Sequence, residues 1–239
     1  MKKKLLAGLT CGVIIFGISG VTGATTIAFD GQTDGNNYVS PYASSPGYLT
    51  ETFNGVGLGA VGSGTLTGFD QGAWSWSGLA SVVNGSNGPY SAPMGVTDKD
   101  TTNYMSAPNP SSNGSVTLTL GQGYGYFGFW SGSLDWYNSI SFYLGGINGT
   151  RVDIFTGSEL AFGVANGNQT SFDTNHYISF YNFSSLFDTV VFTSTKYAME
   201  FDNVTAGPAP VPEPATMLLM GTGLAGLVAA NRRRKANKS

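Results

Sequence analysis

Few residues in this chain are of the types that perform acid–base, nucleophilic or metal chemistry. It has one histidine, His176, and one cysteine, Cys11. No Gly-x-Ser-x-Gly sequence is present to hold a nucleophilic serine on a sharp turn, and a zinc site needs several histidine or cysteine ligands. Glycoside hydrolysis needs two carboxyl groups about 5 to 9.5 Å apart. Glu51, Glu159 and Glu200 could supply them, but none lies in a recognisable motif, so we interpret them as solvated surface carboxylates and expect no enzyme.

Calcium binding is the metal chemistry that the sequence suits best, because Ca²⁺ takes oxygen ligands from carboxylates, amides and backbone carbonyls. Asp30 and Asp34 follow the first expected strand, and Asp202 lies in the last one. Since the first and last strands of sandwich domains often come close, we predict these three residues as ligands of a structural calcium ion. Asp98 and Asp100 on a loop form a second, weaker candidate. We expect no other cofactor.

Carbohydrate binding is the ligand chemistry that the aromatic residues suggest, because sugar rings stack on exposed aromatic side chains. Trp74 and Trp76 flank Ser75, so in a strand they would share one face. We predict this pair as a stacking platform, with core packing as the alternative interpretation.

The elements that position these residues read as strands. Apolar side chains recur with a period of two, and no long period of 3.6 residues occurs in the central region. Short strands separated by Gly, Asn and Pro turns predict an all-β domain, an antiparallel two-sheet sandwich or jelly roll, over residues 25–205. Residues 92–114 read as a long polar loop. The expected strands are 27–29, 115–120, 139–144, 152–154, 177–181, 189–194 and 197–204.

The charge of this domain is acidic. Between Thr25 and Pro210, three basic and thirteen acidic residues give a net charge of −10, whereas the whole chain has −3. Such a domain is repelled by phosphate backbones, so we expect no nucleic-acid partner.

The N-terminus has the layout of a secretory signal peptide, with a helical apolar segment. Three lysines, Lys2 to Lys4, precede an apolar stretch, and the small residues of Thr22-Gly23-Ala24 follow. We predict a signal peptide over residues 1–24 that signal peptidase removes after Ala24, with Gly23 as the near alternative. Cys11 would leave with it, so the mature protein would have no thiol.

The C-terminus carries a second apolar segment with defined flanks. A linker at 206–211 precedes Pro212-Glu213-Pro214, an apolar run at 215–230 and a basic cluster. As a helix the run would span about 24 Å, short of the roughly 30 Å hydrocarbon core, which snorkelling and local thinning can accommodate. Basic residues stay on the cytoplasmic side, so we predict a single transmembrane helix. The cluster is Arg232, Arg233, Arg234 and Lys235.

Together, Pro-Glu-Pro, the apolar run and the basic cluster resemble the PEP-CTERM sorting signal, here at residues 212–235. The resemblance implies that exosortase, a membrane protease-transpeptidase of Gram-negative bacteria that make extracellular polysaccharide, recognises Pro212, Glu213 and Pro214 and that cleavage falls near them. A softer resemblance links residues 132–140 and 198–204 to patterns in one group of PEP-CTERM surface proteins.

These observations predict an exported, non-enzymatic protein of the cell surface or biofilm matrix. It would pass through an intermediate held in the inner membrane by the C-terminal helix, and exosortase would then process it. The alternative is a carbohydrate-binding module for extracellular polysaccharide, and a hydrolase is the least favoured reading.

Overall fold

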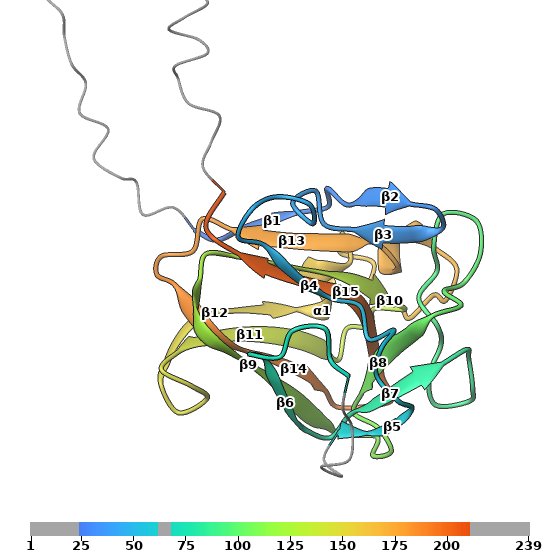
Figure 1. Cartoon of the computed structure of the whole chain (residues 1–239). Coiled ribbons are helices and arrows are strands. Elements are labelled where there is room, and N and C mark those ends of the chain that lie inside the picture. The colour runs from blue at the N-terminus through green and yellow to red at the C-terminus, as the bar shows by residue number, and fades with distance from the viewer. Residues whose placement is uncertain (1–23, 62–67, 211–239) are drawn as a thin grey trace, which may run out of the picture.

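The computed structural model describes residues 24–61 and 68–210. In these residues two antiparallel sheets pack face to face, and helix is confined to α1 (Gly157–Leu160) and the 3₁₀ turn η2 (Phe172–Thr174) (Figure 1). The all-β sandwich is therefore confirmed. The expected N-terminal signal segment and the expected C-terminal transmembrane helix lie outside the described residues. No helix within the described residues is long and apolar enough to cross a membrane.

The larger sheet has the order β1-β13-β10-β15-β8-β7-β5, and β4 also pairs with β15. The smaller sheet has the order β12-β11-β14-β9-β6, and β2 and β3 form a separate hairpin. The strands of the larger sheet are β1 (Thr26–Ala28), β4 (Leu49–Glu51), β5 (Gly59–Ala60), β7 (Ser81–Asn84), β8 (Asn103–Ala107), β10 (Tyr126–Gly132), β13 (Tyr177–Tyr181) and β15 (Met199–Gly207). The others are β2 (Gln32–Asp34), β3 (Asn37–Val39), β6 (Ser75–Gly78), β9 (Gly114–Tyr124), β11 (Asn138–Leu144), β12 (Thr150–Thr156) and β14 (Phe187–Ser194).

The connections from β8 to β15 follow a jelly roll. Each of these strands crosses to the opposite sheet, except that β11 and β12 form a hairpin within the smaller one. The order β13-β10-β15-β8 therefore lies over β12-β11-β14-β9, which is the arrangement of an eight-stranded jelly roll.

Aromatic side chains fill the space between the sheets. Phe192 of β14 stacks on Phe201 of β15, with ring centroids 4.0 Å apart and an interplanar angle of 11°. Phe129 of β10 meets Phe192 edge-on at 5.3 Å. All three side chains are fully buried, so they join the two sheets into one core.

The outer face of the larger sheet is also covered. The N-terminal segment crosses it (Figure 1), placing Tyr38 of β3 against Trp130 of β10 with ring centroids 6.0 Å apart. The Asn203 amide donates to the Tyr38 carbonyl at 2.9 Å. Every residue of β10 and β15 is consequently buried, including polar residues on the outward face.

Both ends of the described chain lie at one end of the larger sheet. Thr26 of β1 pairs with Tyr181 of β13, and Gly207 of β15 pairs with Tyr126 of β10. Because β13 and β10 pair in register between them, these four residues form a row across the sheet. The chain thus enters and leaves the domain at the same end (Figure 1).

The structure corrects three details of the expected elements. Strand β8 lies within residues 92–114, which read as a loop. The last strand runs to Gly207, so Ala206 and Gly207, expected in the linker, pair with β10. Strand β10 had no counterpart among the expected strands, because apolar side chains stand on both of its faces and its sequence shows no alternation.

Candidate functional site

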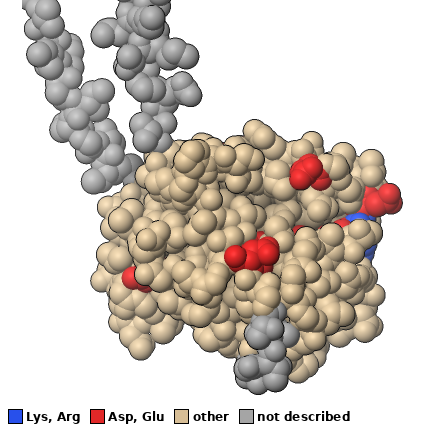
Figure 2. All heavy atoms as spheres, in the orientation of Figure 1, with Lys and Arg blue, Asp and Glu red and all other residues tan. Residues whose placement is uncertain are grey.

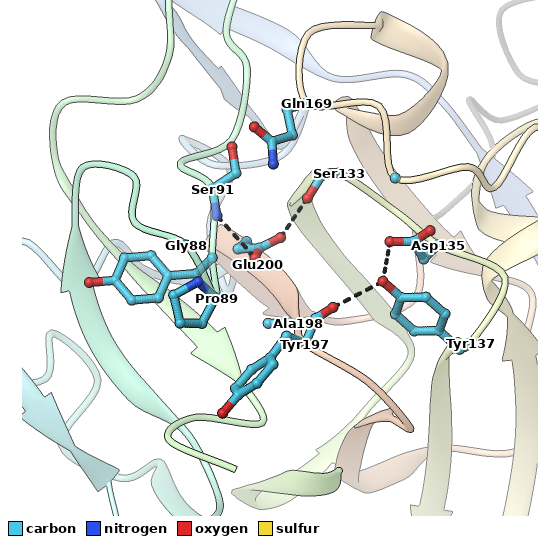
Figure 3. Close-up of a pocket in the computed structure, with 12 residues that line it drawn as sticks. Gly88, Pro89, Ser91, Ser133, Asp135, Tyr137, Gln169, Tyr197, Ala198 and Glu200 are labelled. Carbon is cyan, nitrogen blue, oxygen red and sulfur yellow. Dashed lines mark hydrogen bonds between the residues drawn. The ribbon is translucent and has the colours of Figure 1, made fainter. Parts of the chain in front are cut away.

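A small polar pocket of about 130 Å³ opens at the end of the sandwich opposite to the chain ends. Loops between β7 and β8, between β10 and β11 and before η2 surround it, and the start of β15 forms its floor (Figure 3). The register places this floor near Gly132, which pairs with Glu200 at the far end of β10 from Tyr126. The lining residues are Gly88, Pro89, Tyr90, Ser91, Ser133, Asp135, Tyr137, Gly167, Gln169, Tyr197, Ala198 and Glu200.

Glu200 is the buried acid at the floor of the pocket. Its side chain is 1% exposed, and burial is the main cause that raises its pKa to about 8. The Ser133 hydroxyl donates to Oε2 at 2.8 Å, and the Ser91 N–H donates to Oε1 at 3.2 Å (Figure 3). Both oxygens are therefore committed to bonds that join the two flanking loops to β15.

Asp135 forms the second acidic group of the pocket. Its Oδ2 accepts a hydrogen bond from the Tyr137 hydroxyl at 2.5 Å (Figure 3). Partial burial raises the pKa of Asp135, and the negative charge of Asp135 adds to burial in raising the pKa of Tyr137. The Tyr137 hydroxyl also lies 2.9 Å from the Tyr197 carbonyl oxygen, which is a second acceptor for its proton.

Aromatic residues lie at the rim of the pocket. Tyr197 lines it and is 41% exposed. Trp136 does not line the pocket itself, but it is 62% exposed and its ring meets that of the lining residue Tyr137 edge-on, with centroids 5.5 Å apart. The Lys196 ammonium lies 5.1 Å from the centre of the Trp136 ring, a cation–π geometry. The rim thus offers aromatic surface beside the polar groups of the floor.

Lys99 supplies a positive charge next to the pocket. Its Nζ donates to the Ser91 hydroxyl at 2.6 Å and to Gln169 Oε1 at 3.3 Å. The pocket therefore presents hydroxyl and amide groups and the Asp135 carboxyl, with the Lys99 ammonium beside them, a set that can hydrogen-bond a small, strongly polar ligand.

The stacking platform predicted at Trp74 and Trp76 is wrong. The two side chains do share one face, but they are 5% and 8% exposed. Trp76 instead stacks in the core on Phe192 and Phe201, at 6.4 and 5.9 Å between ring centroids. The period-two pattern predicts that two residues share a face, but it does not say which face meets the other sheet.

The calcium site predicted at Asp30, Asp34 and Asp202 is also wrong in its composition. No group of three or more His, Cys, Asp or Glu side chains that could hold a metal occurs among residues 24–61 and 68–210. Asp30 accepts from the Ser179 hydroxyl, Asp34 is exposed in the β2–β3 hairpin, and Asp202 is fully buried. Strands β13 and β10 separate β1 from β15, so the first and last strands are not neighbours.

Two of the three glutamates interpreted as surface carboxylates are buried. Glu51 is 0% exposed, and burial raises its pKa to about 7, while its oxygens accept from the Phe53 and Gln71 N–H groups. Glu159 is exposed and forms the capping box of α1 with Thr156. Glu200 is the pocket residue already described.

His176 has the environment of a core residue. Its ring nitrogens lie 2.7 Å from the Phe172 carbonyl and 2.9 Å from the Leu160 carbonyl, and the side chain is 0% exposed. Burial lowers its pKa. Both nitrogens are thus occupied by backbone groups.

No catalytic motif in the sequence predicted this pocket. One signal did point to it: the segments 132–140 and 198–204, which carry the softer resemblance, meet there. They contribute Ser133, Asp135, Tyr137, Ala198 and Glu200 to the lining. The Ser91 and Gln169 loops join them only through the tertiary fold.

The comparisons with known proteins bear mainly on the C-terminal tail. The family model of the PEP-CTERM protein-sorting motif matches residues 210–234, which confirms the resemblance of the tail. Pro212 to Pro214 and Arg232 to Arg234 fall within the match, while all residues after Pro210 lie outside the described structure.

The searches of whole proteins add little. No curated protein matches the chain. Among solved structures, a chain described as CpGH89CBM32-6 produced by Clostridium perfringens is similar over 43% of this chain and 74% of its own, at 16% identity and a TM-score of 0.29. A similarity this low bears on neither fold nor ligand.

Proposed function

We propose that this chain, which carries a PEP-CTERM protein-sorting motif at residues 210–234, is a non-enzymatic protein of the bacterial cell surface or biofilm matrix. The motif implies export, sorting to the surface and processing by exosortase. Signal peptidase removes residues 1–24, and the segment 215–230 holds an intermediate in the inner membrane of a Gram-negative cell until the tail is processed. The motif match is the observation that carries this proposal.

The geometry of the domain supports display at a surface. The sorting motif begins three residues after β15 ends at Gly207, while the pocket floor at Glu200 lies at the other end of the same strand. Seven residues of extended strand correspond to about 23 Å. A domain tethered through its C-terminus would therefore turn the pocket away from the membrane.

The hydrogen bonding of the acids supports a role other than catalysis. A general acid or base must reach the proton that it transfers. Glu200 is 1% exposed, and protein donors occupy both of its oxygens. Both Glu51 oxygens accept backbone N–H bonds, and Asp135 accepts from Tyr137. Each carboxyl is thus engaged in holding the fold together.

Cell fractionation tests this proposal. The mature domain is expected at the cell surface or in the medium of a wild-type strain, and this distribution should be lost when the exosortase gene is deleted. A chain in which Pro212, Glu213 and Pro214 are all replaced by alanine should behave as in the deletion strain. Retention of the wild-type chain in the cytoplasm would refute the proposal.

Carbohydrate binding is the second candidate, favoured by the pocket rather than by Trp74 and Trp76. Sugar sites combine a few hydrogen-bonding groups with aromatic surface, as Tyr197 and Trp136 provide here beside a polar floor. At about 130 Å³ the pocket suits a single sugar residue or the end of a chain. Extracellular polysaccharide is the corresponding ligand class.

Binding of a polysaccharide panel to the full chain in detergent tests this second candidate. Replacing Trp136 by alanine should weaken binding about two- to tenfold, because aromatic contacts of this kind contribute roughly 0.5–1.5 kcal/mol beyond area burial. Ile147→Ala is the matched control, since Ile147 is 47% exposed in the β11–β12 turn and does not line the pocket. Equal affinities of both variants for a bound polysaccharide would exclude the rim as the binding surface.

A further inference from the structure

Two buried carboxyl groups face each other beneath the loops that cover the larger sheet. Asp202 of β15 is 0% exposed and Asp100, three residues before β8, is 2% exposed. The two side chains lie within hydrogen-bonding reach of each other. An ionised carboxylate has no proton to donate, so two of them cannot hydrogen-bond to each other. In this poorly solvated interior their negative charges would repel.

Three oxygen atoms of this pair have no hydrogen-bond donor among residues 24–61 and 68–210. They are Oδ2 of Asp100 and both Oδ1 and Oδ2 of Asp202. The Asn203 N–H lies near enough to favour the ionised form of Asp202, but its geometry is not that of a hydrogen bond. Buried polar atoms without a partner are rare in folded proteins, so this cluster needs a partner that the described part of the chain does not supply.

A shared proton does not satisfy the cluster. One proton between the two carboxyl groups would engage one oxygen of each, which leaves the third oxygen buried without a partner. Glu51 adds a further negative influence on Asp202, and its own oxygens are occupied by backbone N–H groups. A divalent cation held by both oxygens of Asp202 and by Oδ2 of Asp100 would engage all three and neutralise both charges.

We propose that the carboxylates of Asp100 and Asp202 bind a structural calcium ion. Calcium accepts bidentate and monodentate carboxylates together and completes its shell with backbone carbonyls or water, so two acidic side chains suffice. Asp100 is already oriented for this role, because its Oδ1 accepts from the Thr102 N–H at 2.8 Å and the Thr102 hydroxyl at 2.6 Å. The free Oδ2 is thereby left to the ion.

The ion would fasten the loop beside the pocket to the central strand. The loop between β7 and β8 is joined to β15 by the Ser91–Glu200 bond and carries Lys99 next to Asp100. A calcium bridge from Asp100 to Asp202 gives this loop a second attachment, two residues along β15 from the first. The site is therefore separate from the pocket but stabilises one of its walls.

Elemental analysis and thermal unfolding of the full chain in detergent test the proposal. Mass spectrometry of the elements should find about one calcium per chain in the wild type and in Asp98→Asn, and none in Asp202→Asn or Asp100→Asn. Asp98 is the matched control, because it is exposed on the same loop as Asp100. After stripping with a chelator, calcium at 100 times its dissociation constant should raise the melting temperature of wild type by about 5–10 °C.

The two asparagine variants distinguish calcium binding from a proton shared by the two carboxyl groups. Asparagine at position 202 resembles the protonated acid, so a proton-sharing pair would tolerate Asp202→Asn without loss of stability. If the wild type contains no calcium and does not respond to it, the proposal is wrong. It is also wrong if magnesium gives the larger shift or if Asp202→Asn and Asp100→Asn respond as the wild type does. If one variant fails to fold, the calcium content of the wild type and of the other variant still shows whether these carboxylates bind calcium.

Discussion

Glu200 and Asp202 occupy alternate positions on β15, and both side chains point to the covered outer face of the larger sheet. Burial raises the pKa of Glu200 to about 8 from 4.5 and holds the pKa of Asp202 well above its usual range. Glu51 is shifted in the same direction, to about 7. These acids make the stability of the domain depend on pH.

The sign of this dependence follows from proton binding. Between pH 4.5 and about 8 the folded state retains the Glu200 proton, whereas the unfolded state has released it. The contribution of Glu200 to the free energy of unfolding is therefore complete below pH 4.5. It decreases by about 1.4 kcal/mol per pH unit as the pH rises towards 8. Denaturant unfolding in excess chelator should accordingly give a lower free energy of unfolding at pH 8 than at pH 5.

Substitution assigns this pH dependence to a residue. Glu200→Gln resembles the protonated acid and should reduce the slope between pH 5 and 8. The control Glu159→Gln should leave the slope in place, because Glu159 is exposed on α1. A slope that is identical in wild type and Glu200→Gln would contradict the raised pKa of this carboxyl.

At the scale of single residues the sequence did not predict position. Low counts of histidine and cysteine turned attention to carboxylates and aromatic residues. The burial of Glu51, Glu200 and Asp202 could not be foreseen, because it depends on segments distant in the chain, such as the Ser91 loop that lies on Glu200. Trp136, the exposed tryptophan, also carries no local signal that distinguishes it from Trp76.

Strand β15 contains a β-bulge between its acidic residues, Glu200 and Asp202, and the end that leads towards the sorting motif. The register with β10 shifts between Gly128 and Trp130, and Asn203 adopts a left-handed conformation with φ of 48°. A bulge inserts an extra residue and re-aims the side chains beside it. Here it lies directly after Asp202, and the Asn203 amide reaches the Tyr38 carbonyl of the covering hairpin.

Two substitutions at Asn203 distinguish backbone conformation from hydrogen bonding. Asn203→Gly keeps the left-handed conformation without strain and loses the bond to Tyr38, so it should cost about 1 kcal/mol. Asn203→Val loses the same bond and adds the strain of a β-branched residue at positive φ, a further 1–2 kcal/mol or so. Unfolding free energies in the order wild type, glycine, valine are expected. A valine variant as stable as the glycine variant would show that the bulge is not strained.

At the scale of elements, periodicity predicted the strands with one apolar face. Residues 177–181 form β13 with the expected bounds, and the strands expected at 115–120, 139–144 and 189–194 lie within β9, β11 and β14. Strand β10 escaped because large apolar side chains stand on both of its faces, and β8 because its five residues lie within a polar surrounding segment. Strands β13 and β15 are buried as well, but their sequences alternate polar and apolar residues, and this alternation identified them.

The described domain combines a sparse, mainly acidic set of charges with a polarised layout. Acidic side chains are scattered over the face in Figure 2, and basic ones lie near one edge. The chain enters and leaves at one end of the larger sheet, and the pocket lies at the other. The tail and the sandwich were predictable from motif and periodicity, whereas the pocket depends on four segments that only the fold brings together.

The central claim is that both ends of the chain are processed on the way to the surface. Its most direct test is terminal peptide mapping of the protein recovered from the cell surface or the medium. We predict an N-terminus at Thr25, after removal of Ala24, and no peptides beyond the Pro212–Pro214 motif. Recovery of a chain that retains residues 1–24 or the segment 215–235 would contradict the account.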